Sequence, residues 1–170
     1  MSLCESIRNK NITEINRLIE SGEDIFQKTP ANSNPLHIAV SSGLECNHEI
    51  VYILLRRAND LENLDKYINS QNDKGETPLF LACQNASDWS GHEEAIKILI
   101  SNGADLNIQD KNGDTPLHKA LYQESMSICE LLINSGARLD IENSEGETVR
   151  DMVSDMRIVP SDIIELMDDM

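Results

Sequence analysis

The chain lacks long apolar runs. Its longest, residues 50–55, is far shorter than the roughly 20 residues that a membrane-spanning helix needs. Charged side chains at Glu5, Arg8, Lys10 and Glu14 also interrupt the N-terminal segment in which a secretory signal would lie. We therefore expect a protein of the cytoplasm, or of the nucleus, that does not enter membranes.

Positive charge is scarce as well. The sequence holds 14 Lys and Arg against 30 Asp and Glu, a formal net charge of −16. Residues 140–170 alone carry ten acidic and two basic side chains. Such a field repels phosphate backbones, so we expect no binding to nucleic acid. The acidic excess fits either a partner protein with a basic surface or a solvated face that only keeps the chain soluble.

Motifs of catalytic and metal sites are missing too. No glycine-rich phosphate loop, His-Glu-x-x-His or Gly-x-Ser-x-Gly occurs, so we predict that the chain is not an enzyme and holds no cofactor or metal. The four cysteines, of which Cys4 is the first, have no paired spacing and are predicted to be reduced thiols. We expect Cys83 and Cys129 to be buried on helices, and Cys46, in an inserted loop, to be exposed and oxidisable.

What the sequence does contain is a recurring tetrapeptide. Its copies are Asn34-Pro35-Leu36-His37, Thr77-Pro78-Leu79-Phe80, Thr115-Pro116-Leu117-His118 and a decayed Thr148-Val149-Arg150-Asp151. Their starts are 43, 38 and 33 residues apart. A threonine hydroxyl can accept a backbone N–H at a helix start, and proline suits the first helical position because no N–H is left unsatisfied there. The motif therefore predicts four helix starts.

A Thr-Pro-Leu-His signature with a period near 33 residues is typical of the ankyrin repeat, which this chain resembles. The resemblance implies an all-α ankyrin-repeat solenoid of stacked helix pairs with short β-hairpin fingers. We divide the single domain, residues 1–170, into an N-capping repeat at 1–33, full repeats at 34–76, 77–114 and 115–147, and a C-capping repeat at 148–170. In the family, the motif histidine bonds back to the first motif residue and to the next repeat. His37 and His118 match that position, and at Phe80 an apolar ring must replace the bond.

A second helix is expected in each repeat, ending at a glycine such as Gly103 or Gly136, which suits the left-handed residue after a helix. The two longer intervals indicate inserted residues, which we place at 44–47, 59–67 and 86–90. In the second insertion, Leu61, Leu64 and Ile68 recur at helical spacing and predict an added helical turn that packs on the stack.

The third insertion precedes a predicted helix start. Residues 90–93 read as a capping box that opens the following helix. His48 and His92 lie early in the second helices of their repeats, and we interpret both as structural, because no paired metal ligands accompany them.

The resemblance also implies where a partner would bind: on the fingers and on the first helix of each pair. By position, this surface is predicted to comprise Ser41, Ser42, Asp73, Lys74, Glu76, Gln84, Asn85, Lys111, Asn112, Asp114, Tyr122, Gln123, Ser144, Glu145 and Glu147. We expect its acidic members to be exposed on the finger surface. The single tryptophan, Trp89, lies in the third insertion and is either a second contact residue or packed locally.

The predicted function is a protein–protein interaction module, most simply a monomer, whose partner has a basic surface. One alternative is an inhibitor that masks a signalling protein, like the short ankyrin inhibitors of kinases or of Rel-type transcription factors, or a viral or bacterial effector. Another is a structural subunit of a larger assembly or a fragment of a longer ankyrin protein. The atypical end units argue against a fragment, because an internal cut would leave regular repeats at both ends.

Overall fold

The computed structural model describes residues 2–41, 46–86, 91–155, 164 and 167. These residues form ten helices and no β-strand. The helices are α1 (Leu3–Arg8), α2 (Ile12–Glu20), α3 (Pro35–Ser41), α4 (His48–Asp60), α5 (Leu64–Ile68), α6 (Pro78–Gln84), α7 (His92–Ser101), α8 (Pro116–Tyr122), α9 (Met126–Asn134) and α10 (Val149–Asp155).

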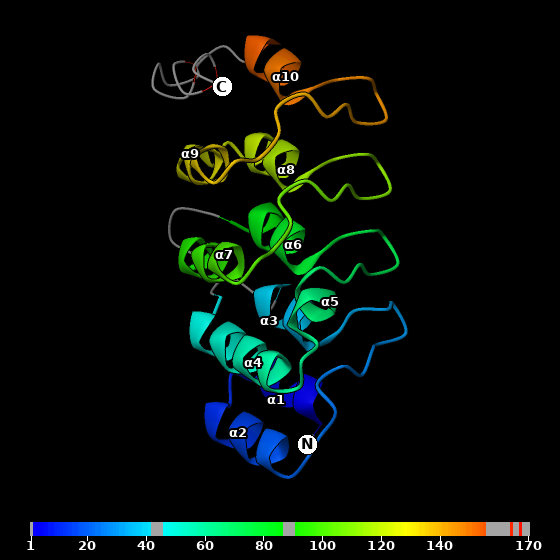
Figure 1. Ribbon diagram of the computed structural model, residues 1–170, viewed down its shortest axis with the longest axis vertical. Coiled ribbons are helices and arrows are strands. Elements are labelled where there is room, and N and C mark those ends of the chain that lie inside the picture. The colour runs from blue at the N-terminus through cyan, green and yellow to red at the C-terminus, as the bar shows by residue number, and fades with distance from the viewer. Residues whose placement is uncertain (1, 42–45, 87–90, 156–163, 165–166, 168–170) are drawn as a thin grey trace.

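The helices stack in two layers (Figure 1). One layer holds α1, α3, α6, α8 and α10, and the other holds α2, α4, α7 and α9, so that each helix pair packs on the pair before it. The loops between pairs project to one side as a row of fingers. This arrangement confirms the predicted all-α stack. No helix within the described segments is both long and apolar enough to span a membrane.

The repeated tetrapeptide starts the first helix of each pair for the expected reason. Thr77 Oγ1 and Thr115 Oγ1 each accept the backbone N–H of the residue three positions later, at 3.2 and 3.4 Å, and a proline follows at the first helical position. The decayed copy keeps this bond, because Thr148 Oγ1 accepts the equivalent N–H at 3.2 Å. The hydroxyl cap therefore suffices where the proline is lost.

The motif histidine ties neighbouring repeats together. Nε2 of His37 donates to the carbonyl oxygen of Glu76 at 3.1 Å, and Nε2 of His118 donates to that of Glu147 at 3.3 Å. In both rings, Nδ1 accepts the backbone N–H of the first motif residue at 3.2 Å. These are the bonds that the resemblance implied. The ring of Phe80 is fully buried at the same position, so apolar packing replaces the polar bond there.

The fingers are hairpin-like turns whose described residues contain no strand, which corrects the expectation of β-hairpins. Each turn closes through two backbone hydrogen bonds: the N–H of Asn72, Asp110 or Asn143 donates to the carbonyl four residues later at 2.9–3.0 Å, and its carbonyl accepts from the glycine N–H three residues later at 3.0–3.1 Å. A further bond joins successive fingers, from Lys111 N–H to the Lys74 carbonyl at 2.9 Å. Two bonds within one turn are too short a ladder for a strand, and the bonds between turns link the fingers into a row.

Glycine is required at the finger tips by both conformation and space. Gly75 and Gly113 have φ values of +79° and +77°, in the left-handed region. A Cβ atom on Gly113 would lie 2.8 Å from the backbone nitrogen of Ser144, and one on Gly75 would lie 3.0 Å from that of Lys111. The close approach of successive fingers therefore depends on the missing side chain.

The second insertion is partly as predicted. It lengthens α4, which runs for 13 residues, and adds the short helix α5. Ile68 is fully buried, and Tyr67 packs edge-on against Phe26 with ring centroids 5.3 Å apart. The expectation for Leu61 is wrong: its side chain is 39% exposed, because it caps the end of α4 and lies outside the new helix. The added helix thus packs through Tyr67 and Ile68, and Leu64 is partly buried against the same core, as predicted.

Three other expectations need correction or lie outside the described residues. The start of α7 has no capping box: Gly91 is the N-cap, in the left-handed conformation and without a side chain to cap with. Half of the first insertion, residues 44 and 45, and most of the third, residues 87–90, are not described. The same holds for most of the chain beyond Asp155, where a last helix was expected. His92 is buried, and its Nε2 donates to the carbonyl of Val40 at 3.0 Å, which fits a structural role.

The cysteines differ from the prediction at one position. Cys83 and Cys129 are fully buried, as expected. Cys46 is only 7% exposed, and burial raises the pKa of its thiol to about 11, so it is not the oxidisable thiol that its loop position suggested. Its Sγ lies 3.8 Å from the carbonyl of Ala39, at the end of the preceding first helix. Cys4 is the most accessible of the four.

Replacing Leu117 with Ala should lower the free energy of unfolding by about 2–5 kcal/mol, because the side chain is fully buried between repeats and its loss leaves a cavity. Leu61→Ala is the matched control, since the same change at a 39% exposed site should cost no more than about 0.5 kcal/mol. Urea unfolding of both variants measures the difference. Equal losses would mean that the two leucines have been assigned to the wrong faces.

Acidification should destabilise the stack through His37. Desolvation on burial lowers the pKa of this ring from 6.5 to about 4, against the opposing effect of the Glu76 carbonyl, which accepts a hydrogen bond from Nε2. The unfolded chain therefore takes up the proton first, so this stabilisation is complete above about pH 6.5 and declines toward pH 4, by up to about 3 kcal/mol.

Unfolding at a series of pH values tests this dependence. His37→Gln should be less stable at pH 7 and should lose less stability than the parent between pH 7 and pH 4. The control His48→Gln changes an exposed histidine of α4 and should keep the parent slope. If His37→Gln also kept the parent slope, the neutral buried ring would not be the source of the acid sensitivity.

Candidate functional site

The structure divides the predicted contact residues by exposure. Ten of them are exposed on the finger side of the stack: Ser41, Asp73, Lys74, Asn85, Lys111, Asn112, Tyr122, Gln123, Ser144 and Glu145. Gln84 and Glu147 are half-buried, and Ser42 and Trp89 lie outside the described residues. Glu76 and Asp114 are only 6% and 5% exposed, so the expectation that they are surface charges is wrong.

The buried carboxylates hold the fingers in shape. Glu76 Oε2 accepts a hydrogen bond from the side-chain amide of Asn72 at 2.8 Å, and Asn72 Oδ1 accepts the N–H of Glu76 at 3.1 Å. Asp110 Oδ1 makes the equivalent bond to the N–H of Asp114 at 3.0 Å, and Asn143 Oδ1 to that of Glu147 at 3.0 Å. Polar side chains thus close each turn.

Asp114 is also paired with a residue that sequence reasoning missed. Lys119 Nζ lies 2.9 Å from Asp114 Oδ2, with the two side chains 18% and 7% exposed. The same Nζ lies 5.7 Å from the ring centroid of Phe80 and 5.0 Å from that of Tyr122. Cation–π contacts of this kind contribute about 0.5–1 kcal/mol each at exposed sites. Phe80, where other copies have histidine, therefore supplies a ring face for the lysine of the next repeat.

A sequence signal for Lys119 was present. It stands four residues after the first motif residue, Thr115, where the other full repeats have the apolar Ile38 and Leu81. A lysine at a position that is otherwise apolar indicates a partner close by, and the carboxylate in the preceding finger, Asp114, is the one at hand. Only the folded geometry shows that the finger brings it within reach.

The side-chain amides of two glutamines hydrogen-bond successive fingers to one another. Gln71 Nε2 donates to the carbonyls of Gly75 at 2.7 Å and of Gln109 at 3.0 Å. Gln109 Nε2 repeats the pattern in the next finger, donating to the carbonyls of Gly113 at 2.6 Å and of Glu142 at 2.9 Å. Each amide therefore bonds within its own finger and to its neighbour. A surface held in this way loses little conformational entropy when it binds a partner.

Three grooves lie between the fingers and the ends of the first helices. The first, of about 820 Å³, is lined by Arg8, Lys10, Thr29, Pro30, Ala31, Ser33, Ile38 and Ser41. The second, of about 390 Å³, is lined by Asp73, Lys74, Glu76, Gln84, Asp110, Lys111, Asn112 and Lys119. The third, of about 440 Å³, is lined by Asn112, Asp114, Lys119, Tyr122, Asn143, Ser144 and Glu145.

Tyr122 is the exposed aromatic side chain of this face. It is 48% exposed, and its hydroxyl accepts a hydrogen bond from the Asn143 amide at 3.4 Å. Desolvation and the nearby carboxylates of Asp114, Glu147 and Glu145 raise its pKa, so the hydroxyl is protonated near neutral pH. A half-exposed ring beside carboxylates suits contact with an apolar or cationic side chain.

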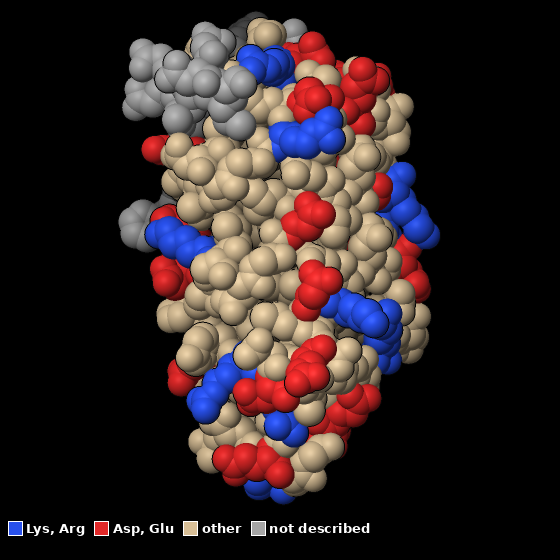
Figure 2. All heavy atoms as spheres, in the orientation of Figure 1, with Lys and Arg blue, Asp and Glu red and all other residues tan. Residues whose placement is uncertain are grey.

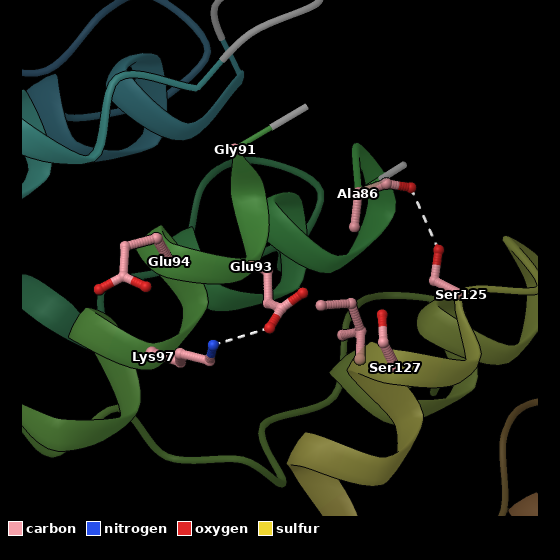
Figure 3. Close-up of a pocket in the computed structure, with 8 residues that line it drawn as sticks. Ala86, Gly91, Glu93, Glu94, Lys97, Ser125 and Ser127 are labelled. Atoms are coloured by element: carbon pink, nitrogen blue, oxygen red, sulfur yellow. Dashed lines mark hydrogen bonds and ion pairs between the residues drawn. The ribbon is translucent and has the colours of Figure 1, made fainter. Parts of the chain in front are cut away.

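A smaller cleft of about 280 Å³ lies on the opposite side, between α7 and α9 (Figure 3). Glu93 and Lys97 point toward each other across its wall and form an ion pair of 2.7 Å, and Ser125 Oγ donates to the carbonyl of Ala86 at 3.2 Å. Ala86, the first residue of the third insertion, lines this cleft, and Trp89 lies outside the described residues.

Charges of both signs are interspersed over the face that Figure 2 displays, so the acidic excess does not form one continuous patch there. Within the described part of the chain, no group of three or more His, Cys, Asp or Glu side chains is placed to hold a metal ion. The candidate site therefore consists of the finger surface and the three grooves beside it.

The comparisons identify the repeats. The family description "Ankyrin repeats (3 copies)" matches residues 3–110 and 85–152. The chain belongs to the ankyrin-repeat family. Repeats of this family are generally protein–protein interaction modules, which agrees with the general function expected from the sequence.

Several curated proteins are similar to this ankyrin array. The target of rapamycin complex 2 subunit AVO2 of Saccharomyces cerevisiae is 34% identical over 117 residues, 68% of this chain and 24% of that protein. The neurogenic locus Notch protein of Drosophila melanogaster is 33% identical over 64% of the chain and 4% of that protein. A putative ankyrin repeat protein of Acanthamoeba polyphaga mimivirus is 36% identical over 60% of the chain and 9% of that protein. The chain thus spans about a quarter or less of these relatives.

Replacing Asp114 with Ala should lower the free energy of unfolding by about 1–3 kcal/mol, because Lys119 and a finger amide lose a buried partner. Asp73→Ala, an exposed carboxylate on the neighbouring finger, is the control and should change stability by no more than about 0.5 kcal/mol. Thermal or urea unfolding provides the measurement. A loss for Asp114→Ala as small as that of the control would contradict a structural role for this carboxylate.

Proposed function

We propose that this array binds a partner protein through the exposed residues of its fingers and of the adjoining ends of α3, α6 and α8. The observation that carries the proposal is the set of side-chain hydrogen bonds that join successive fingers. Gln71 and Gln109 fix the spacing of the finger tips before any partner arrives, so the tips present one preformed surface.

The tip residues are suited to contact and not to holding the fold. Asp73, Lys111 and Glu145 are exposed, and their side chains form no ion pair within the described part of the chain. The carboxylates that close or brace the turns, Glu76 and Asp114, are instead buried. Charge available to a partner therefore comes from the tips, where opposite charge across an interface mainly raises the rate of association.

With a partner in place, the simplest action of the array is occlusion: it covers a surface of its target. A partner with Lys or Arg at the contact fits the overall charge of −16. Binding would also be weakened by salt, because the Debye length falls from about 10 Å at 0.1 M to about 3 Å at 1 M ionic strength.

Charge reversal at the tips tests this surface. Asp73→Lys with Glu145→Lys should slow association with the natural partner several-fold at low salt, because two exposed attractions become repulsions, and the difference should shrink at high salt. Stopped-flow or surface-plasmon measurements of the association rate provide the readout. The partner must first be captured from the natural host and identified by mass spectrometry.

Two controls define the outcome. Glu130→Lys makes the same charge change as one of the two tip reversals, at an exposed site on α9 on the other side of the helix pairs, and should leave the rate near that of the parent. Trp89→Ala tests the third insertion as the rival contact. Loss of binding with Trp89→Ala, together with unchanged rates for the tip reversals, would move the contact surface to that insertion.

A second candidate is a subunit role in a larger assembly. It is favoured by the relative from Saccharomyces cerevisiae, whose name describes it as a subunit of a complex. The two candidates differ in stoichiometry and lifetime: a subunit should co-elute with the whole assembly at fixed ratio, whereas an occluding inhibitor or effector should be found with one target. Size-exclusion chromatography of the captured material separates them.

A further inference from the structure

We infer that the finger surface binds an extended polypeptide segment in one charge order, with an acidic block over the first groove and a basic block over the third. The inference rests on the proposed function and names the chemistry of the segment that the same surface would hold. It differs from the interpretation based on net charge alone, which predicts a uniformly basic partner.

The three grooves lie along one side of the stack but not in successive repeats. The first lies at the end of α1 beside the finger of residues 29–33, the second between the fingers before α6 and α8, and the third between the fingers before α8 and α10. Ser41, Gln84 and Tyr122 each stand seven residues after the first motif residue, and one of them lines each groove. The finger tips keep the same register, with the pairs Pro30-Ala31, Asp73-Lys74, Lys111-Asn112 and Ser144-Glu145 four and three residues before it. The grooves can therefore be compared along one side of the stack, although the first takes its charge from the end of α1 and the third from a finger tip.

The first groove is cationic. The exposed Arg8, at the end of α1, supplies its positive charge, and Lys10 also lines it. The described lining includes no carboxylate. The adjoining finger contributes the uncharged tip Pro30-Ala31 and the hydroxyl side chains of Thr29 and Ser33. In a chain with a net charge of −16, a groove of about 820 Å³ with this lining is an exception.

The third groove has the opposite balance. Its one lysine, Lys119, is already paired with Asp114 at 2.9 Å, which leaves Glu145 as the exposed charge of its lining. The exposed ring of Tyr122 lies beside it, ready to cover the aliphatic stem of a bound lysine or arginine. The groove between these two contains three carboxylates and three lysines, so the charge changes sign in steps along the stack.

The distance between the ends suits a short segment. The first groove lies at the end of α1 and the third between α8 and the finger before α10, three repeats further along the stack. Packed helices lie about 8–10 Å from one another, so the groove centres are separated by about 25–30 Å. About eight residues of extended chain span that length. A segment with an acidic block and a basic block whose centres are about eight residues apart would therefore satisfy both grooves at once.

Synthetic peptides provide a direct test with the whole chain. Three fluorescent peptides of about 12 residues, long enough to cover about 40 Å, share one Gly/Ser spacer: one has a Glu block and a Lys block, one has Lys in both blocks, and one has Glu in both. Affinity is measured by fluorescence anisotropy at an ionic strength of about 0.02 M, where the Debye length is about 20 Å.

Net charge and groove order predict different rankings. Attraction to the overall charge alone would make the all-Lys peptide bind most tightly. The groove order predicts that the mixed peptide binds at least about threefold more tightly than the all-Lys peptide, the gain expected from two weak exposed charge pairs. The all-Glu peptide should be the weakest.

Arg8→Glu and Arg56→Glu separate the groove from its surroundings. Both arginines are exposed near the C-terminal end of a helix, but Arg56 lies on α4, away from the fingers. Arg8→Glu should weaken the mixed peptide about three- to tenfold and strengthen the all-Lys peptide, because it reverses one charge of the first groove. Arg56→Glu should change both by the same small factor. If Arg8→Glu proves unstable, Arg8→Gln removes the charge without adding another, and the mixed peptide should still weaken.

The result that overturns the inference is specific. If the all-Lys peptide binds most tightly and Arg8→Glu acts no differently from Arg56→Glu, the charge order plays no part, and the acidic finger surface of the proposed function stands alone. If no peptide responds to Arg8→Glu or to the tip reversals Asp73→Lys and Glu145→Lys, both the inference and the finger surface are wrong.

Discussion

Contact between successive repeats is the constraint on which the rest of the structure depends. No helix pair here encloses a core of its own: Leu36, Leu79 and Leu117 are buried only because the neighbouring pairs cover them. The histidine hydrogen bonds add directional polar contacts to this apolar packing. His37 and His118 each reach the backbone carbonyl that precedes the next motif, so a buried polar bond sets the register between repeats wherever the histidine is kept.

The same constraint extends outward into the fingers. Backbone bonds and the Gln71 and Gln109 amides join each finger to the next, which lets stacking in the core define spacing at the surface. Gly75 shows how closely core stacking and finger spacing are linked, because a Cβ atom on this residue would meet the backbone of the following finger. A surface built in this way is rigid without having strands of its own.

Loss of the histidine in the second motif has a consequence one repeat later. Phe80 fills the position by apolar packing, and its ring also faces Lys119, which in turn pairs with Asp114. One carboxylate is thereby withdrawn from the acidic face and one lysine is neutralised. The charge that a partner meets consequently differs from the charge that the composition suggests, and it differs from groove to groove.

The sequence by itself determined the architecture: the caps, prolines and glycines act through bonds to residues a few positions away, so Thr77, Thr115 and Gly103 could be assigned from spacing alone. It also located the inserted helix near Ile68. Only the tertiary structure decided which polar side chains a partner can reach. Glu76 and Asp114 occupy finger positions like their exposed neighbours, and Cys46 occupies a loop, yet all three are buried. The Asp114 carboxylate also accepts a hydrogen bond from Asn143 of the next finger. Burial is set by what packs from elsewhere in the chain, and local spacing carries no record of that.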